Sequence, residues 1–312
     1  MLILGSSGVI GTALTSLLLK EKRPFHTAAR FQENLRVESK VIGYCLNTGS
    51  IVGLENYSSF LPRVAFFLAG ISNPSRVFSS PEEAYSVNFF RTIQILNKLE
   101  ELDFRTYFIS SVEIFPGEKI DYQEHDEPRP LNLYGQLKLR TEEHILNRMT
   151  NCTIVRTAWN IASAKSPATM RDPVLQTYLS LTSDNPRMSV DTYFTPIPAE
   201  DFSEILVKLA DSSAQDRVYH IAGEDFVSRA ELADHLLTYS KNKQLKGYHK
   251  TFHHCLYPTT GETRGRLNGL ASRKILGSVS HSYKDIQAAL KIRVEVIDNY
   301  LRDSCLTSIQ SR

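Results

Sequence analysis

The chain has 312 residues, of which 42% are hydrophobic and 22% charged, and its formal net charge is +2. This length suffices for one large domain with a smaller lobe, and the near-neutral charge argues against nucleic acid or an anionic membrane as partner. No apolar run approaches the roughly 20 residues that span a bilayer, and the first residues lack the basic start and long apolar core of a signal peptide. The four cysteines lie far apart, so we expect reduced thiols in a cytoplasmic protein.

Short apolar runs alternate with helical patterns through the first half of the chain. Such alternation predicts an α/β fold of the Rossmann type, a doubly wound parallel sheet with helices on both faces. Between the third and fourth strands the pattern is weak, with only Val52–Ser59 as a possible helix. The expected strands are Met1–Leu4, Phe25–Ala29, Lys40–Tyr44, Val64–Leu68, Tyr107–Ile109 and Thr153–Arg156, and the expected helices are Val9–Lys20, Pro81–Leu102 and Leu133–Arg148.

Two helix starts carry the residues of a capping box, in which a serine hydroxyl and a glutamate three residues later bind the first backbone N–H groups of a helix. They are Ser80 with Glu83 and Ser228 with Glu231. Pro81, at the first helical position, is also typical of a helix start. We therefore expect helices to begin directly after both serines.

The second half of the chain is less regular. After Arg156 the alternation loosens, although the expected helix Phe202–Ala210 and strand Val218–Ile221 return to the sheet. We therefore expect residues 1–158, together with 193–222, to form a dinucleotide-binding domain. The remaining residues, 159–192 and 223–312, are expected to form a smaller substrate-binding lobe over the carboxyl ends of the strands, where open α/β sheets bind ligands.

Three glycines, Gly5, Gly8 and Gly11, follow the first expected strand and open the first expected helix. Small residues here let the chain turn tightly, let the backbone approach a pyrophosphate and let the helix pack on the strand. The helix N-terminus then directs backbone N–H groups at the phosphate. The alternative is a tight turn that binds nothing. We expect a cofactor-binding turn formed by Gly5, Ser7, Gly8, Val9, Ile10 and Gly11.

The second expected strand ends in Ala28, Ala29 and Arg30. An enzyme that uses NAD(H) commonly has a carboxylate near this point for the ribose hydroxyls, and none is present. Arginine instead matches phosphate with a planar fork of donors. The sequence therefore favours NADP(H) over NAD(H), with Arg30 at the 2′-phosphate. The alternative is that Arg30 is a surface charge without a contact.

Tyr134 and Lys138 are four residues apart in an expected helix, which places the phenol and the ammonium on one face. A nearby ammonium favours the phenolate, so we expect Lys138 to lower the pKa of Tyr134 towards the working pH. Tyr134 could then exchange a proton with a carbonyl or alcohol oxygen. Ser110 and Ser111 end an earlier strand, and a hydroxyl there can hydrogen-bond the same oxygen.

Two further features lie near the expected cofactor. Leu68, Ala69 and Gly70 end the fourth strand, where small residues let the backbone pass beside a ribose. Asn88 lies inside the long helix Pro81–Leu102. It is either a tolerated polar position or a support for the strand that carries the cofactor.

Taken in order, the glycine turn, the end of the fourth strand, the helix asparagine, the serine pair and the Tyr134/Lys138 pair resemble the extended short-chain dehydrogenase/reductase family. The resemblance covers nearly the whole chain. Within that family the second half is similar to the dTDP-4-dehydrorhamnose reductase branch. The segments that carry this likeness are Ile154–Trp159, Thr195–Asp201, Tyr219–Gly223 and Arg264–Leu270.

The resemblance implies a nicotinamide cofactor and a nucleotide-linked sugar as substrate. It implies Ser111, Tyr134 and Lys138 as catalytic residues, with Tyr134 and Lys138 also at the cofactor. A homodimer through the two long helices is implied in the same way. The residues implied at the substrate are Ser111, Val112, Trp159 and Arg264, although Trp159 could be a core aromatic and Arg264 part of a solvated loop.

Two stretches depart from the reductase branch. Cys45 and Leu46 stand where many relatives have an aspartate that holds adenine, and we expect Leu46 at the cofactor. The residues after Ser111, from Val112 to Phe115, are closer to the sugar epimerases.

The leading prediction is an NADP(H)-dependent reductase of a 4-keto nucleotide sugar, with hydride from NADPH and Tyr134 as proton donor. A nucleotide-sugar 4-epimerase would use the same groups but retain its cofactor through a full cycle. A non-catalytic NADP-binding regulatory subunit would keep the fold alone. The presence of Ser111, Tyr134 and Lys138 together favours an enzyme.

Overall fold

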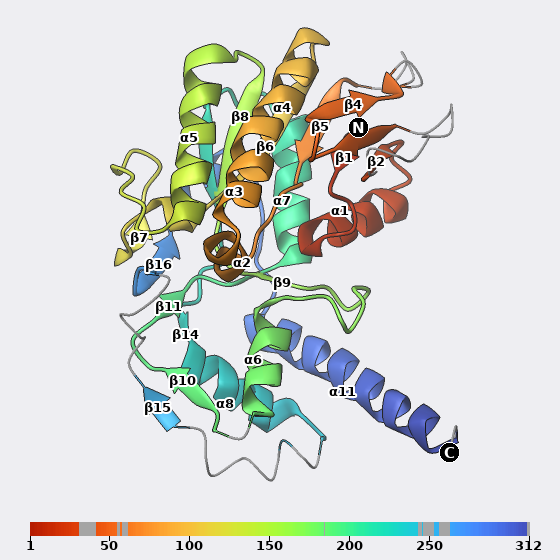
Figure 1. Ribbon diagram of the computed structural model, residues 1–312, viewed down its shortest axis with the longest axis vertical. Coiled ribbons are helices and arrows are strands. Elements are labelled where there is room, and N and C mark those ends of the chain that lie inside the picture. The colour runs from red at the N-terminus through yellow and green to blue at the C-terminus, as the bar shows by residue number, and fades with distance from the viewer. Residues whose placement is uncertain are drawn as a thin grey trace.

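The computed structural model of the protein describes residues 1–30, 42–54, 57, 62–183, 185–242, 245, 253–255 and 263–310. Figure 1 shows two parts, of which the upper holds a large sheet between helices and the lower holds α6, α8 and α11 with short strands. The bounds of these three helices are Pro173–Leu181, Arg229–Tyr239 and Ile286–Gln310.

The large sheet has eight strands in the order β13-β8-β6-β5-β1-β2-β3-β4. Every pairing is parallel except that of β3 with β4. The order reverses between β1 and β5, and open α/β sheets bind ligands at the carboxyl ends of the strands at such a point. The predicted doubly wound fold is thereby confirmed. The strands are β1 (Leu2–Leu4), β2 (His26–Arg30), β3 (Gly43–Cys45), β4 (Ser50–Val52), β5 (Val64–Phe67), β6 (Arg105–Ser111), β8 (Cys152–Thr157) and β13 (Val218–Ile221).

Alternate side chains of each strand point to opposite faces of this sheet, and each face carries its own apolar core. On one face, Met1 and Ile3 pack with α1 (Val9–Lys20) and α7 (Ala199–Asp211). On the other face, Leu2 and Leu4 pack with α4 (Thr92–Glu101) and α5 (Leu133–Arg148). Each fully buried aliphatic side chain contributes about 1.5–3 kcal/mol, so the two layers fix the sheet from both sides (Figure 1).

The helix expected over Pro81–Leu102 is present but interrupted. It consists of α3 (Pro81–Tyr85), one π-helical stretch, η2 (Ser86–Arg91), and α4. The Thr92 hydroxyl donates to the Val87 carbonyl, 2.8 Å away, so a side chain supplies a donor where the regular α-helical ladder is broken. Asn88 lies in this stretch and is therefore turned differently from a residue of a regular helix.

The expected capping box at Ser80 is wrong, because its residues have other partners. Ser80 forms no side-chain cap. Its N–H ends the preceding helix, α2 (Pro74–Ser79), by donating to the Arg76 carbonyl. Glu83 forms an ion pair with Arg76, at 2.7 Å, instead of turning back to Ser80. The capping box of Ser228 with Glu231 is confirmed.

The possible helix over Val52–Ser59 is also wrong at its start. Val52 belongs to β4, whose Ser50–Val52 backbone pairs antiparallel with β3. Residues 55, 56, 58 and 59 lie outside the described part of the chain. A strand forms here because the edge of β3 offers backbone hydrogen-bonding groups to pair with. The local sequence of residues 52–59 cannot show that such a partner lies nearby.

The lower part of the molecule is built on a helical core and a small sheet. Tyr178 of α6, Leu236 of α8 and Val294 of α11 share one apolar cluster. The sheet has the order β14-β11-β16-β7 and begins close to the end of β6. The remaining elements are η3 (Val112–Ile114), β7 (Glu118–Tyr122), β9 (Asn160–Ile161), β10 (Arg187–Ser189), β11 (Tyr193–Phe194), β12 (Ile197–Pro198), β14 (Val227–Ser228), β15 (His253–Cys255), β16 (Leu267–Leu270) and α10 (Arg273–Ser278).

A buried arginine fastens α11 to the loop before α6. The Arg293 side chain is fully buried, pairs with Asp172 at 3.2 Å and donates to the carbonyls of Pro167 and Met170. Because a buried charge needs such partners, this contact holds the loop in one place. None of the described helices is both long and apolar enough to cross a membrane.

Candidate active site

The turn between β1 and α1 is packed so closely that a side chain is excluded at two of its three glycines, Gly5 and Gly11. Gly5 has φ +94°, and a Cβ there would lie 2.9 Å from the Ala69 nitrogen. A Cβ on Gly11 would collide with the Gly5 carbonyl oxygen. Gly8 is the extended residue before α1, and the first turn of α1 holds no acidic side chain. The N-terminus of α1 therefore keeps its partial positive charge, and the turn fits a pyrophosphate.

The end of β5 is held against this turn by Asn88. Both ends of the Asn88 amide bind Ile71, whose N–H donates to Oδ1 at 2.7 Å and whose carbonyl accepts from Nδ2 at 2.9 Å. Gly70, at φ +149°, lies between Ala69 and Ile71, and a Cβ there would be 3.2 Å from Asn88 Oδ1. In this structure Asn88 thus supports the segment Leu68–Gly70.

The described part of the structure shows no contact that tests the expected cofactor roles of Leu46 and Arg30. Leu46 lies buried just after β3, next to the buried Cys45. The side chain of Arg30 lies outside the described part of the chain, although its backbone ends β2. The placement of both residues at a cofactor remains a prediction.

Ser111, Tyr134 and Lys138 come together at the carboxyl edge of the sheet. Ser111 ends β6, and Tyr134 and Lys138 occupy the first turns of α5, which covers that strand. The Ser111 hydroxyl lies close enough to the Tyr134 phenol to lower its pKa. The Lys138 Nζ donates to the Ile109 carbonyl at 2.8 Å and lies 4.6 Å from the centroid of the Phe108 ring.

The electrostatics of the phenol differ from the expectation. The pKa of Tyr134 is raised to about 12, mainly by burial and also by the charge of Glu113, although Ser111 and Arg264 act to lower it. Burial also lowers the pKa of Lys138 to about 8, against the opposing charge of Glu142. The expected lowering of the Tyr134 pKa by Lys138 is therefore wrong for this structure, because burial dominates and the ammonium is bonded to a backbone carbonyl.

Arg264 reaches the phenol because two glycines let the chain cross. A Cβ on Gly117 would collide with Gly265, so the segment before β16 passes directly over the turn before β7. The Thr263 carbonyl accepts from Asn132 Nδ2 at 3.0 Å. This crossing places Arg264, from the segment before β16, close enough to lower the pKa of Tyr134.

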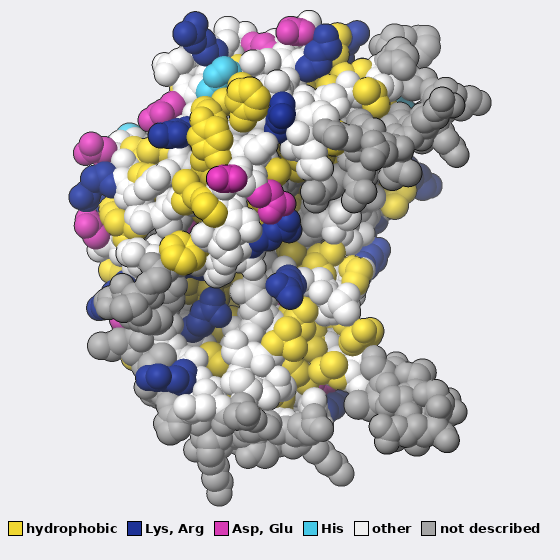
Figure 2. Space-filling view, in the orientation of Figure 1, with side chains coloured by type: hydrophobic (Ala, Val, Ile, Leu, Met, Phe, Trp, Pro, Cys, Tyr) yellow, Lys and Arg dark blue, Asp and Glu magenta, His cyan; other side chains and the backbone are white. Residues whose placement is uncertain are grey.

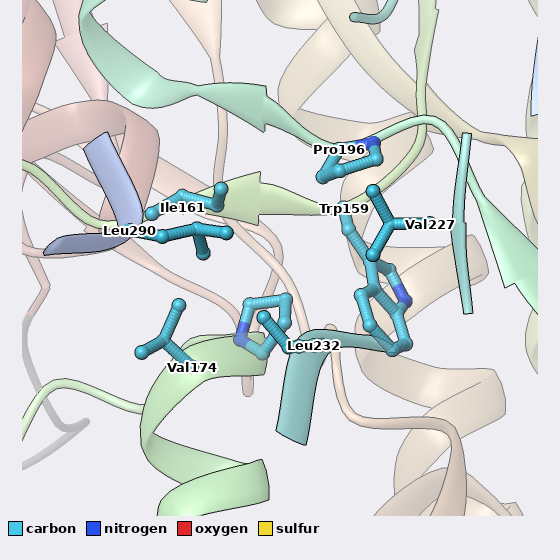
Figure 3. A pocket seen from close by; sticks show the side chains of 8 residues that line it. Trp159, Ile161, Val174, Pro196, Val227, Leu232 and Leu290 are labelled. Carbon is cyan, nitrogen blue, oxygen red and sulfur yellow. The ribbon is translucent and has the colours of Figure 1, made fainter. Parts of the chain in front are cut away.

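The other two residues expected at the substrate lie in apolar surroundings. Val112 is buried in a cluster with Ile114 and Leu270. Trp159 stacks on Phe194, with ring centroids 3.5 Å apart, and the Arg229 guanidinium lies 4.9 Å from its ring centroid. The same indole lines an apolar pocket of the lower part (Figure 3). The pocket residues are Trp159, Ile161, Pro173, Val174, Pro196, Val227, Leu232 and Leu290.

Sequence reasoning missed two polar residues beside Tyr134. Asn132 caps α5, with its Oδ1 accepting from the Gly135 N–H at 2.9 Å. It is 8% exposed, and its Nδ2 donates to the Glu113 carboxylate at 2.8 Å. An asparagine directly before a helical pattern is a recognised cap signal, so Asn132 could have been found. Nothing in the apolar stretch around Glu113 indicates that its carboxylate turns inward.

The surface of the molecule is hollowed between its two parts (Figure 2). Figure 2 shows that the molecule is narrower between its upper and lower parts, and that Lys and Arg side chains lie on the surface there. A positive surface here suits an anionic ligand.

A doubly wound sheet with a glycine turn at its switch point belongs to the Rossmann class of nicotinamide-dependent oxidoreductases. The chain is a member of the RmlD substrate binding domain family, whose model matches residues 1–290. This confirms the predicted extended short-chain dehydrogenase/reductase family, the likeness to its dTDP-4-dehydrorhamnose reductase branch, and the predicted class of enzyme.

Relatives show the same likeness at low identity. The chain is 21% identical over 235 residues to methionine adenosyltransferase 2 subunit beta of Xenopus tropicalis, covering 74% of this chain and 69% of the relative. It is 29% identical over 161 residues to dTDP-4-dehydrorhamnose reductase of Mycobacterium tuberculosis, covering 48% and 50%. The solved dTDP-4-dehydrorhamnose reductase of Bacillus anthracis, in complex with NADP, superposes with a TM-score of 0.68 at 17% identity, covering 93% of this chain and 95% of that one.

Proposed function

We propose that the protein is an NADP(H)-dependent reductase of a 4-keto nucleotide sugar. The observation that carries the proposal is the meeting of Ser111, Tyr134 and Lys138 at the carboxyl edge of the sheet, from two different elements. The glycine turn opens on the same edge, because Gly5 packs against the residues after β5. A proton donor and a dinucleotide turn therefore share one crevice.

NADPH, when bound there, supplies the hydride for the ketone carbon. Tyr134 donates the proton to the ketone oxygen, and the Ser111 hydroxyl holds that oxygen in place. With its pKa lowered to about 8, Lys138 is largely protonated at neutral pH and can bind the nicotinamide ribose. We expect Arg264 to contact the sugar nucleotide and Trp159 to border it.

The proposed preference for NADP(H) over NAD(H) rests on Arg30 and on the alanines at positions 28 and 29, where an NAD(H)-binding protein could have a carboxylate. The B. anthracis relative, crystallised with NADP, supports this choice. Cys45, a buried thiol at the end of β3, offers adenine no carboxylate, so we expect the neighbouring backbone and Leu46 to border that ring.

The test is incubation of the purified chain with NADPH and a panel of 4-keto nucleotide sugars, following the nicotinamide absorbance and the sugar product. A reductase consumes NADPH in proportion to product. Product without net loss of NADPH would establish the epimerase instead. Tyr134→Phe is the matched control, because it removes the proposed proton donor and keeps the ring.

A non-catalytic regulatory subunit is the second candidate, and the likeness to methionine adenosyltransferase 2 subunit beta favours it. Such a subunit would bind NADPH and turn over no sugar nucleotide. The joint presence of Ser111, Tyr134 and Lys138 in one site is the argument against it. Tight NADPH binding with no turnover on any member of the panel would favour the regulatory function.

We also propose a homodimer through the two long helical segments predicted over Pro81–Leu102 and Leu133–Arg148, together with the adjoining helix α2. Phe78, Tyr85, Phe90 and Leu146 are large apolar side chains that are 43–58% exposed on these helices. Figure 2 shows apolar atoms gathered over this region, and exposed apolar patches of this kind mark interaction surfaces. Sedimentation should show a dimer that Phe90→Glu dissociates, whereas Leu179→Glu, an equivalent change on α6, should leave it intact.

A further inference from the structure

Glu113 is a buried carboxylate in the turn that directly follows Ser111. It lies in η3 and is 7% exposed. Its backbone N–H donates to the Ser111 hydroxyl at 3.2 Å, and its backbone carbonyl lies where a Cβ on Gly135 would be. The turn after β6 and the first turn of α5 are therefore in direct contact at Glu113.

The Glu113 side chain adds a second link between these elements. Its Oε2 accepts from Asn132 Nδ2 at 2.8 Å, and Asn132 in turn caps α5 through the Gly135 N–H. Tyr134 lies between Asn132 and Gly135. The position of the phenol relative to Ser111 is thus fixed by a chain of hydrogen bonds that begins at the Glu113 carboxylate.

The charges around the phenol are few and opposed. Among the described residues, Glu113 on η3 and Arg264 before β16 are the charged groups that act on Tyr134, with Glu113 the stronger. Lys138, on α5, directs its ammonium to the Ile109 carbonyl. A negative charge beside a phenol opposes phenolate formation, so the arrangement favours the protonated side chain.

We infer that Glu113 is a positioning residue for the proposed reductase: through Asn132 it fixes the turn that carries Tyr134, and its charge disfavours the phenolate, so that Tyr134 stays in the protonated form that reduction needs. The inference rests on the proposed function. In reduction the phenol O–H bond breaks, the proton passes to the ketone oxygen, and the phenolate left behind regains a proton from solvent. A negative neighbour favours that return, because it raises the free energy of the phenolate.

The test separates charge from shape. Glu113→Gln keeps an acceptor for Asn132 and removes the charge, and Glu113→Met removes both within a similar volume. The Tyr134 titration is read from the ultraviolet absorbance of phenolate, as the difference between each protein and the same protein carrying Tyr134→Phe. We expect both variants to lower the pKa of Tyr134 by about one or more, as loss of a like charge at close range does.

Controls make the result specific. Glu118→Gln is the same chemical change at an exposed carboxylate that pairs with Arg129, and it should leave the titration unchanged. Asn132→Ala breaks the hydrogen bond but keeps the Glu113 charge, and should slow reduction without lowering the pKa of Tyr134. An unchanged titration in Glu113→Gln or Glu113→Met would overturn the inference, as would an equal fall in Asn132→Ala. The titration needs no substrate, so a protein that reduces no keto sugar would refute the proposed function and still report on Glu113.

Discussion

Asn88 offers a sharp test of how the cofactor crevice is built. Its amide satisfies both backbone groups of Ile71, at 2.7 and 2.9 Å, and only 4% of the residue is exposed. Asn88→Ala removes both partners and leaves a buried donor and a buried acceptor unpaired. Each such loss costs about 1–3 kcal/mol, so the variant should lose about 2–6 kcal/mol of unfolding free energy. NADPH affinity should fall at least about tenfold, because Ile71 follows the segment packed against Gly5.

Urea unfolding, with and without NADPH, measures the first quantity, and titration of NADPH fluorescence measures the second. Hydrogen exchange gives a local readout, since the Ile71 amide should exchange much faster in Asn88→Ala. Asn97→Ala is the matched control, because Asn97 is an exposed asparagine of α4 bonded to His144, and surface changes usually stay within about 0.5 kcal/mol. A loss in Asn88→Ala no larger than in this control, with unchanged exchange at Ile71, would refute the reasoning.

Three further predictions concern the proposed proton donor, the cofactor preference and a buried ion pair between α5 and β8. Tyr134→Phe should bind NADPH normally and lose about 10²–10⁴-fold in turnover, and wild-type turnover in steady-state assays would remove Tyr134 from catalysis. Arg30→Ala should weaken NADPH binding by about ten- to a hundredfold and leave NADH binding nearly unchanged, while Ala29→Asp should narrow or reverse the preference for NADPH. Titration of each protein with both cofactors measures these affinities. An unchanged ratio of NADPH to NADH affinity in Arg30→Ala would show that Arg30 does not bind the 2′-phosphate. Glu142→Gln leaves the buried Arg156, 2.7 Å away, without its counter-charge. The free energy of unfolding, measured in urea, should therefore fall by about 3–5 kcal/mol. A fall below about 1 kcal/mol would show that Arg156 does not depend on the Glu142 charge.

The elements that local patterns specify were predictable from the sequence. The helix expected over Leu133–Arg148 has those bounds in the structure, since Asn132 caps it and its apolar stripe faces the sheet. The parallel strands were predictable because runs such as Val64–Phe67 are buried on both faces. The capping box at Ser228 depends only on residues three apart.

Features set by distant partners were not predictable in the same way. Ser80 and Glu83 match a capping box in sequence, but Arg76 takes both the Ser80 N–H and the Glu83 carboxylate. The pKa of Tyr134 was expected to fall because of Lys138, yet burial and the Ile109 carbonyl reverse that expectation. Such outcomes depend on which groups the fold brings together, and spacing along the chain does not specify them.

The crossing at Gly117 and Gly265 connects the two parts of the site. It joins the small sheet to the turn after β6, and it carries Thr263 to Asn132, the residue that caps α5. The phenol of Tyr134 is therefore held by groups from both parts of the molecule. In the proposed reductase, a substrate that draws Arg264 towards its own negative charge would weaken the opposition of Arg264 to Glu113, because these two residues act on the phenol with opposite sign. The proposed substrate binding in the lower part and the proposed proton donation by Tyr134 would then be linked by the electrostatics of Arg264.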